Sequence, residues 1–245
     1  MNSGTTVNRT ILPCGIALLL ASVLVAAQGQ APQERVAALK QSLQESHAKL
    51  RTFEWIETTA ISLKGEEKSR KQNRCYYGAD GKVQKVPIVE PAAPPPQASG
   101  RGRRGGRLKE KVVENKKEEL SDYMKKAVAL LHQYVPPDPA RIQASKDAGK
   151  AAMSMVEPNR RARVEFGDYL QPGDSLALEF NPQTNHLLAM MVASYLEKPD
   201  DKVTLNVQFA DLPDGTTYQA ATTLDAPAKN INVKIENSGH RPVSQ

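Results

Sequence analysis

Apolar and polar residues alternate through the C-terminal third of the chain, from Arg161 to Asn237. Residues 203–209 place Val, Leu, Val and Phe at every second position, and residues 231–235 place Ile, Val and Ile in the same way. This period of two is typical of strands with one buried and one solvated face. Turn-forming residues lie between such segments, as in Pro213-Asp214-Gly215. The pattern predicts six sequential antiparallel strands, at residues 161–169, 175–180, 186–196, 202–209, 216–224 and 229–237.

The N-terminal half predicts one amphipathic helix followed by three strands. Valine and leucine residues recur at helical spacing within residues 33–50, with charged residues between them. The period changes to two after Phe53, and Trp55 falls on the more apolar side. Asp80-Gly81 is a strong hairpin signal. These features predict a meander of three strands, at residues 53–64, 68–77 and 82–88.

A segment without sizeable apolar side chains separates the two groups of strands. Residues 90–107 consist largely of Pro, Gly, Ala and Arg, which cannot form a packed core, so we expect a disordered loop. Residues 108–150 return to helical spacing, and the second half of the first helix carries an apolar face. Asp138-Pro139 is typical of the start of a second, shorter helix. We therefore expect a helical excursion between the strands.

Together these elements predict a single α+β domain over residues 28–245. Sequential strands joined by short turns form a meander, and an antiparallel sheet of about eight or nine twisted strands tends to curve. We expect a half-barrel whose concave face is covered by two or three helices.

Residues 1–27 have the organisation of a secretory signal peptide. Arg9 precedes an apolar run that starts at Ile11, and Ala27 supplies a small residue for cleavage. An uncleaved membrane anchor is the alternative, although the run is slightly short for a span of about 20 residues. We expect export, with cleavage near Ala27 and a periplasmic or secreted location. Cleavage would leave Cys75 alone, either as a small apolar strand residue or as a redox-active thiol.

Basic charge is concentrated in one segment. The whole chain carries a net charge of +6, and residues 101–126 hold ten Lys and Arg against five Asp and Glu, which gives +5. A merely solvated loop is the simpler explanation of this local basic surplus, and docking on an anionic membrane or polysaccharide surface is the alternative. Nucleic acid fits poorly, because the arginine-rich residues 90–107 include no aromatic residue and the chain carries an export signal. The side chains for anionic contact would be Arg101, Arg103, Arg104 and Arg107.

Motifs for catalysis or metal binding are missing from the sequence. It contains no G-x-S-x-G elbow, no phosphate-binding P-loop and no H-E-x-x-H pair. The four histidines, at positions 47, 132, 186 and 240, lack the spacing of metal ligands. We predict no catalytic residue, no metal and no cofactor. A hydrolase assembled from distant residues remains a weaker alternative.

The organisation of the chain resembles a known superfamily. An export signal, an N-terminal helix, an aromatic first strand, a helical excursion and a returning meander look like the LolA/LolB/RseB-like periplasmic half-barrels. Phrases such as Asp168-Tyr169-Leu170-Gln171-Pro172-Gly173 and Leu212-Pro213-Asp214-Gly215 are similar to those of uncharacterised exported bacterial proteins. The resemblance implies an apolar concavity that holds acyl chains or lipoproteins beneath helical lids.

The leading functional hypothesis is therefore a monomeric, non-enzymatic carrier or binding protein of the bacterial envelope. Its partner would be a lipid, an acyl chain or a lipidated protein. Flexible methionines suit such a cavity, but they also fill irregular gaps in a core. The alternative is a structural or assembly factor that acts through protein contacts. The residues expected to line a cavity are Trp55, Leu120, Met124, Leu131 and Met190.

Overall fold

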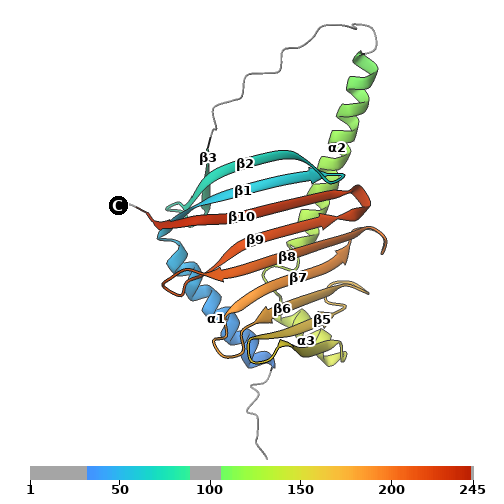
Figure 1. The fold of residues 1–245 in the computed structure, drawn as a ribbon. Coiled ribbons are helices and arrows are strands. Elements are labelled where there is room, and N and C mark those ends of the chain that lie inside the picture. Colours follow the sequence, from blue (N-terminus) through green and yellow to red (C-terminus); the bar gives the residue numbers. More distant parts are fainter. Residues whose placement is uncertain (1–31, 89–105, 244–245) are drawn as a thin grey trace, which may run out of the picture.

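The computed structural model describes the backbone of residues 32–88 and 106–243, and the side chains of residues 41–88 and 118–243. The described residues form one open, curved antiparallel sheet of ten strands and three α-helices (Figure 1). The strands are β1 (Phe53–Leu63), β2 (Glu66–Tyr77), β3 (Val83–Pro87), β4 (Ala151–Glu157), β5 (Arg161–Gly167), β6 (Ser175–Phe180), β7 (Leu187–Tyr195), β8 (Lys202–Asp211), β9 (Thr217–Ala226) and β10 (Ile231–Pro242). The helices are α1 (Pro32–Leu50), α2 (Gly106–Leu131) and α3 (Pro139–Asp147), and a 3₁₀ turn spans Pro227–Lys229.

Two meanders meet in the middle of the sheet. The strand order is β3-β2-β1-β10-β9-β8-β7-β6-β5-β4, so strands that are adjacent in the sheet are also consecutive in the sequence except at one junction. There the last strand returns to the first, and Ile61 of β1 lies opposite Val233 of β10. This long-range pairing joins the two ends of the domain into one sheet.

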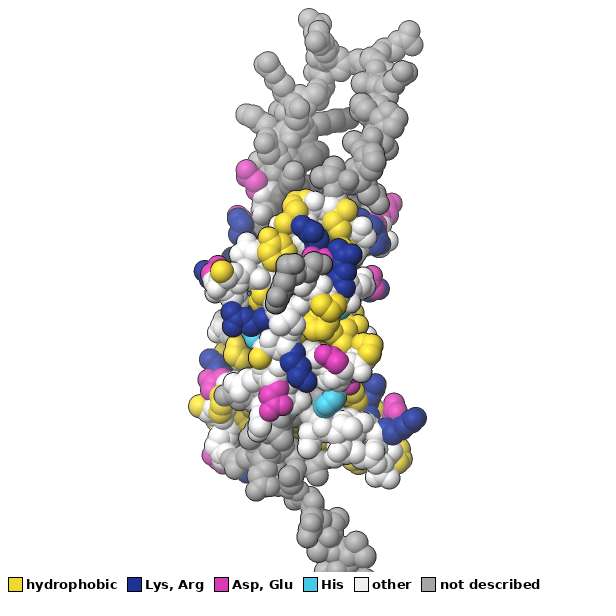
Figure 2. All heavy atoms as spheres, turned by 90° about the vertical axis from the view of Figure 1, so that its left-hand side faces the viewer, with side chains coloured by type: hydrophobic (Ala, Val, Ile, Leu, Met, Phe, Trp, Pro, Cys, Tyr) yellow, Lys and Arg dark blue, Asp and Glu magenta, His cyan; other side chains and the backbone are white. Residues whose placement is uncertain are grey.

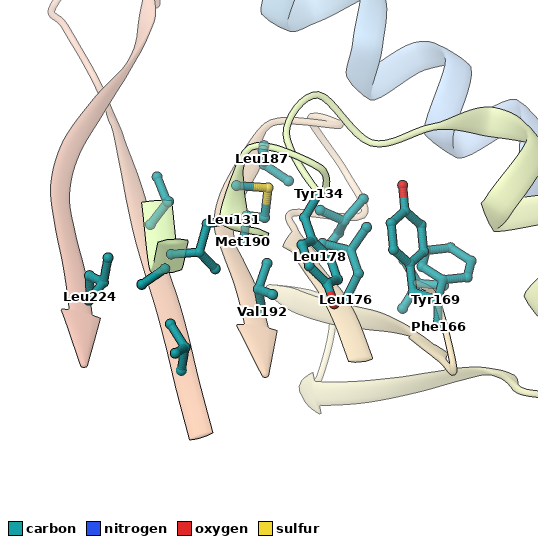
Figure 3. Packing of buried hydrophobic residues seen from close by; sticks show 14 of the residues in the cluster. Leu131, Tyr134, Phe166, Tyr169, Leu176, Leu178, Leu187, Met190, Val192 and Leu224 are labelled. Atoms are coloured by element: carbon teal, nitrogen blue, oxygen red, sulfur yellow. The ribbon is translucent and has the colours of Figure 1, made fainter. Parts of the chain in front are cut away.

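The core lies between the sheet and the helices. Strand residues of one parity, including Val164, Leu178 and Met190, lie opposite one another across β5, β6 and β7 and are buried. Ala127 and Leu131 of α2 belong to the same buried cluster, which also receives Ile142 from α3 and, half-buried, Leu43 from α1. The three helices therefore cover the same, concave face (Figures 1 and 3).

Local sequence explains where several elements begin. The carboxylate of Asp138 accepts a hydrogen bond from the backbone N–H of Ala140 at 2.9 Å, and Pro139 occupies the first turn of α3. This is the arrangement that favours a helix start. Between β9 and β10, Asn230 takes a left-handed conformation with φ of 53° and turns the chain into β10.

The α+β class and the curved antiparallel sheet with covering helices are confirmed, with ten strands in place of eight or nine. The tenth strand is β4, which the sequence pattern did not predict. The final strand also continues to Pro242, five residues beyond its expected end at Asn237. The predicted signal peptide, residues 1–27, lies outside the described residues, as does most of the predicted loop; its last two residues, 106–107, already belong to α2. No helix in the described ranges is both long enough and apolar enough to cross a membrane.

Candidate functional site

A cleft of about 240 Å³ lies on the concave face, at the end of the sheet where β1 begins and β10 ends. Leu50, the last residue of α1, forms one side of it. Strands β1, β2, β3, β9 and β10 supply the rest of the lining, which is rich in aromatic rings. Figure 2 shows this side of the molecule, where hydrophobic side chains gather in patches between Lys and Arg side chains.

Four rings form a connected group in the cleft. The indole of Trp55 stacks on the imidazole of His240, with centroids 5.8 Å apart and planes 11° from parallel. His240 also contacts the Tyr218 ring at 4.1 Å, and Trp55 contacts the Tyr77 ring at 5.6 Å. His47 of α1 packs edge-on against Tyr77 at 5.3 Å, so the helix holds this end of the group. We call Trp55, Tyr77, Tyr218 and His240 the aromatic group.

Hydrogen bonds fix the orientation of the indole. Trp55 donates from Nε1 to Oδ1 of Asn237 at 3.0 Å. The amide nitrogen of Asn237 donates in turn to the backbone carbonyl of Gln219 at 2.9 Å. The chain of bonds runs through β1, β10 and β9, so three strands set the position of one ring.

A carboxylate in the cleft is neutralised by a lysine. Glu57 is 8% exposed, and both of its oxygens accept hydrogen bonds from Nζ of Lys85 at 2.7 Å. Lys85 itself is half-exposed on β3. A charge paired in this way has little reason to attract a free counter-ion, so the cleft offers apolar and aromatic surface with a balanced polar rim.

Burial sets the protonation of the cleft residues. It lowers the pKa of His240 below its usual 6.5, so the imidazole is neutral at pH 7. Burial likewise raises the pKa of Tyr77, with Arg51 acting in the opposite direction. Cys75 is fully buried and lies between Trp55 and Lys85 in the strand register. Burial, followed by the charge of Glu57, raises the pKa of its thiol. A buried, protonated thiol is a poor nucleophile.

A half-covered apolar strip continues from the cleft along β1 and β10. Its cross-strand pairs are Thr59 with Ile235, Ile61 with Val233, and Leu63 with Ile231. Ile61 is 39% exposed, whereas Ile231 at the far end is buried. The strip thus leads from an open aromatic cleft toward the closed core.

The residues expected to line a cavity occupy two places. Trp55 lies in the cleft. Leu131 and Met190 are each 5% exposed and belong to the buried core, and Leu120 and Met124 pack against it half-buried. The four helix and central-strand residues therefore gather with one another and away from Trp55. The arginines expected to contact anionic surfaces, Arg101, Arg103, Arg104 and Arg107, have side chains outside the described part of the chain.

Sequence reasoning missed most of the cleft. The predicted final strand ended at Asn237, which left His240 outside the sheet. The strand instead continues through an irregularity opposite Glu54 and Ile56, where Gly239 adopts a φ of 63°. A bulge of this kind re-aims the following side chain without ending the pairing. The alternation of Trp55 and Glu57 on β1 was visible, but the strands that would face them across the sheet were not.

Comparisons with known proteins assign no family to this chain. No group of His, Cys, Asp and Glu within the described residues is arranged to hold a metal ion. No protein-family model matches the chain, and no curated protein sequence matches it. Among solved structures, the chain is similar to a DUF1329 family protein from Desulfovibrio piger, with 13% identity and a TM-score of 0.35 over 84% of this chain and 93% of that one.

Proposed function

We propose that this protein binds an acyl chain, free or attached to a lipid or lipidated partner, and that the aromatic cleft is the entrance to its site. The observation that carries the proposal is the continuity between the cleft and the half-covered strip along β1 and β10. Such a surface suits a narrow, flexible, apolar ligand. In keeping with the expected export of the chain, the ligand would be one of the bacterial envelope.

The size of the cleft supports a ligand that extends beyond it. Pockets for drug-sized ligands usually measure about 300–1,000 Å³. A cleft of about 240 Å³ would take one end of a chain, while the rest lies along Ile235 and Ile61. Exposed apolar side chains on this route, such as Ile61 at 39% and Val83 at 38%, would lose contact with water when the chain binds.

The electrostatics of the cleft also favour an apolar ligand. Lys85 neutralises Glu57, and His240 is uncharged at pH 7. The site therefore needs no charged group on the part of the ligand that enters it. A charged head group would remain at the mouth, where Lys85 is half-exposed.

Two valines of one strand provide a matched test. Val83 and Val86 both lie on β3 and are 38% and 40% exposed. Val83 pairs with Tyr77 and lines the cleft, whereas Val86 pairs with Arg74 and faces the opposite side of the sheet. Val83→Glu places a carboxylate against the acyl chain and is expected to weaken binding of a fluorescent fatty acid at least about tenfold, or 1.4 kcal/mol.

Val86→Glu is the control, because it adds the same charge to the same strand on the other face. It is expected to bind like the unmodified protein. Equal loss in both variants would point to damage to β3 and would remove the support for the cleft. Failure of the unmodified protein to bind any acyl probe would overturn the proposal and would favour a structural or assembly role.

A further inference from the structure

The two edges of the sheet differ in how well they are protected. Strand β3 is short, and it carries Lys85 and Pro87, both of which discourage pairing with another chain. Strand β4 at the other edge contains neither charge nor proline from Ala151 to Val156. Natural sheets seldom leave such an edge open without a use for it.

The outer edge of β4 presents free backbone groups. Gly167 donates from its backbone N–H to the carbonyl of Lys150 at 2.9 Å, and the same register continues along β4 and β5. Because hydrogen-bonded and non-hydrogen-bonded pairs alternate in an antiparallel ladder, Ala152 and Ser154 direct their N–H and C=O groups toward β5. Met153 and Met155 therefore direct theirs outward, where no described strand pairs with them.

The side chains of the same two residues are apolar and exposed. Met153 lies opposite Val164 and Met155 lies opposite Ala162, and both of these partners are buried in the core. The methionines thus extend the apolar face of the sheet, yet they are 48% and 51% exposed. Helix α3 is bound just before β4, where the backbone N–H of Lys150 donates to the carbonyl of Ser145 at 2.8 Å, and the two methionines stay open.

We propose that β4 pairs antiparallel with β4 of a second copy of this chain, about a two-fold axis at Ser154. In this register Met153 of one copy lies opposite Met155 of the other. Their outward N–H and C=O groups form four hydrogen bonds across the axis. The four methionines make one apolar patch, and the two sheets become a continuous one. This state replaces the monomer expected from the sequence.

A second copy is the partner that fits the edge best, because the edge is complementary to itself under a two-fold rotation. Lys150 precedes the strand and Glu157 ends it. Antiparallel pairing places the acidic end of each copy beside the basic start of the other. The residues between them are small or flexible and carry no charge, so no like charges meet.

The first test is the mass of the full chain in solution, measured by light scattering during size-exclusion chromatography. The proposal predicts twice the chain mass, and a return to the single mass for Met155→Lys, which places two like charges at the axis. Val86→Lys adds the same charge at the β3 edge and is expected to stay dimeric. A single-chain mass for the unmodified protein, across the soluble concentration range, would overturn the proposal.

A cysteine scan tests the register independently of stability. At a non-hydrogen-bonded pair the two Cα atoms are about 4.5 Å apart, which is within reach of a disulfide. Ser154→Cys is therefore expected to form a cross-linked dimer under mild oxidation. In Ala152→Cys the two thiols lie about 13 Å apart along the strands and should not react.

The unmodified protein is the control for any cross-linking through the two cysteines of its own sequence. Equal cross-linking at both positions would exclude the proposed register. The proposed dimer interface lies at β4 and does not include the cleft, so Val83→Glu is expected to leave the mass of the dimer unchanged. The two proposals can therefore fail separately.

Discussion

The contact between Trp55 and His240 makes the cleft sensitive to pH. Burial lowers the pKa of His240 in the folded protein below 6.5, whereas in the unfolded chain the imidazole keeps its ordinary value. As the pH falls below 6.5, the imidazole of the unfolded state therefore takes up a proton before that of the folded state does. The contribution of this residue to stability is complete above pH 6.5 and is lost as the pH falls through the folded pKa.

Fluorescence provides the measurement, because Trp55 is the only tryptophan of the sequence. Protonation of the stacked imidazole is expected to quench the indole, with a midpoint below pH 6.5. His240→Gln should abolish the transition, and His132→Gln, at an exposed position, should leave it in place. A transition that persists in His240→Gln would show that another group controls the ring.

Among the elements, the segment after α2 is fastened to the sheet by a buried polar cluster. The hydroxyl of Tyr134 bonds to the carboxylate of Asp174 and lies 2.8 Å from the hydroxyl oxygen of Ser194. Asp174 is 3% exposed and also accepts backbone N–H bonds from Tyr169 and Gln171 at 2.6 and 2.8 Å. The Asp174 carboxylate thus ties the start of β6 to the segment after α2, and the Tyr134 hydroxyl links both to Ser194 of β7.

Tyr134→Phe keeps the ring and removes the hydroxyl, which leaves Asp174 with one donor fewer. A loss of about 1–3 kcal/mol in the free energy of unfolding is expected, since the group cannot reach water. Tyr195→Phe removes an exposed hydroxyl that donates to the carbonyl of Pro172, and should cost less than about 0.5 kcal/mol. Denaturant unfolding compares the two. Equal values would mean that the cluster contributes nothing beyond the packing of the ring.

The elements that sequence reasoning found are those with a clear period. Strands β8 and β10 could be predicted from their own residues, because one face of each strand is more buried than the other and the sequence alternates accordingly. Strand β4 was not predicted, because its residues are exposed on both faces and show no alternation of burial. The pairing of β4 with β5 depends on tertiary structure, which a local sequence pattern does not reveal.

The site was less predictable than the fold for the same reason. The expected cavity beneath helical lids rested on the superfamily resemblance and on flexible methionines, and two of its residues, Leu131 and Met190, are buried core residues. The cleft is assembled from β1, β2, β3, β9 and β10, which are far apart in the sequence. Only Trp55 among the expected residues belongs to it. The pairing of β1 with β10 brings the others to that ring.

At the scale of the whole molecule, the sheet is covered unevenly. Strands β5 to β9 lie against a continuous buried cluster, whereas residues of β1 and β10 on the same face are largely half-exposed. A protein that only needed a stable core would gain from covering this part as well. The uneven cover is what connects the fold to the proposed binding of an acyl chain.

The most direct measurement of that claim is quenching of Trp55 by a fatty acid brominated along its chain, because bromine quenches an indole only on close contact. Saturable quenching is predicted, with an unbrominated fatty acid of the same length competing for the site and Val83→Glu weakening the effect. Fluorescence that does not change with the brominated acid, while the unmodified protein is folded, would contradict an acyl site in the cleft.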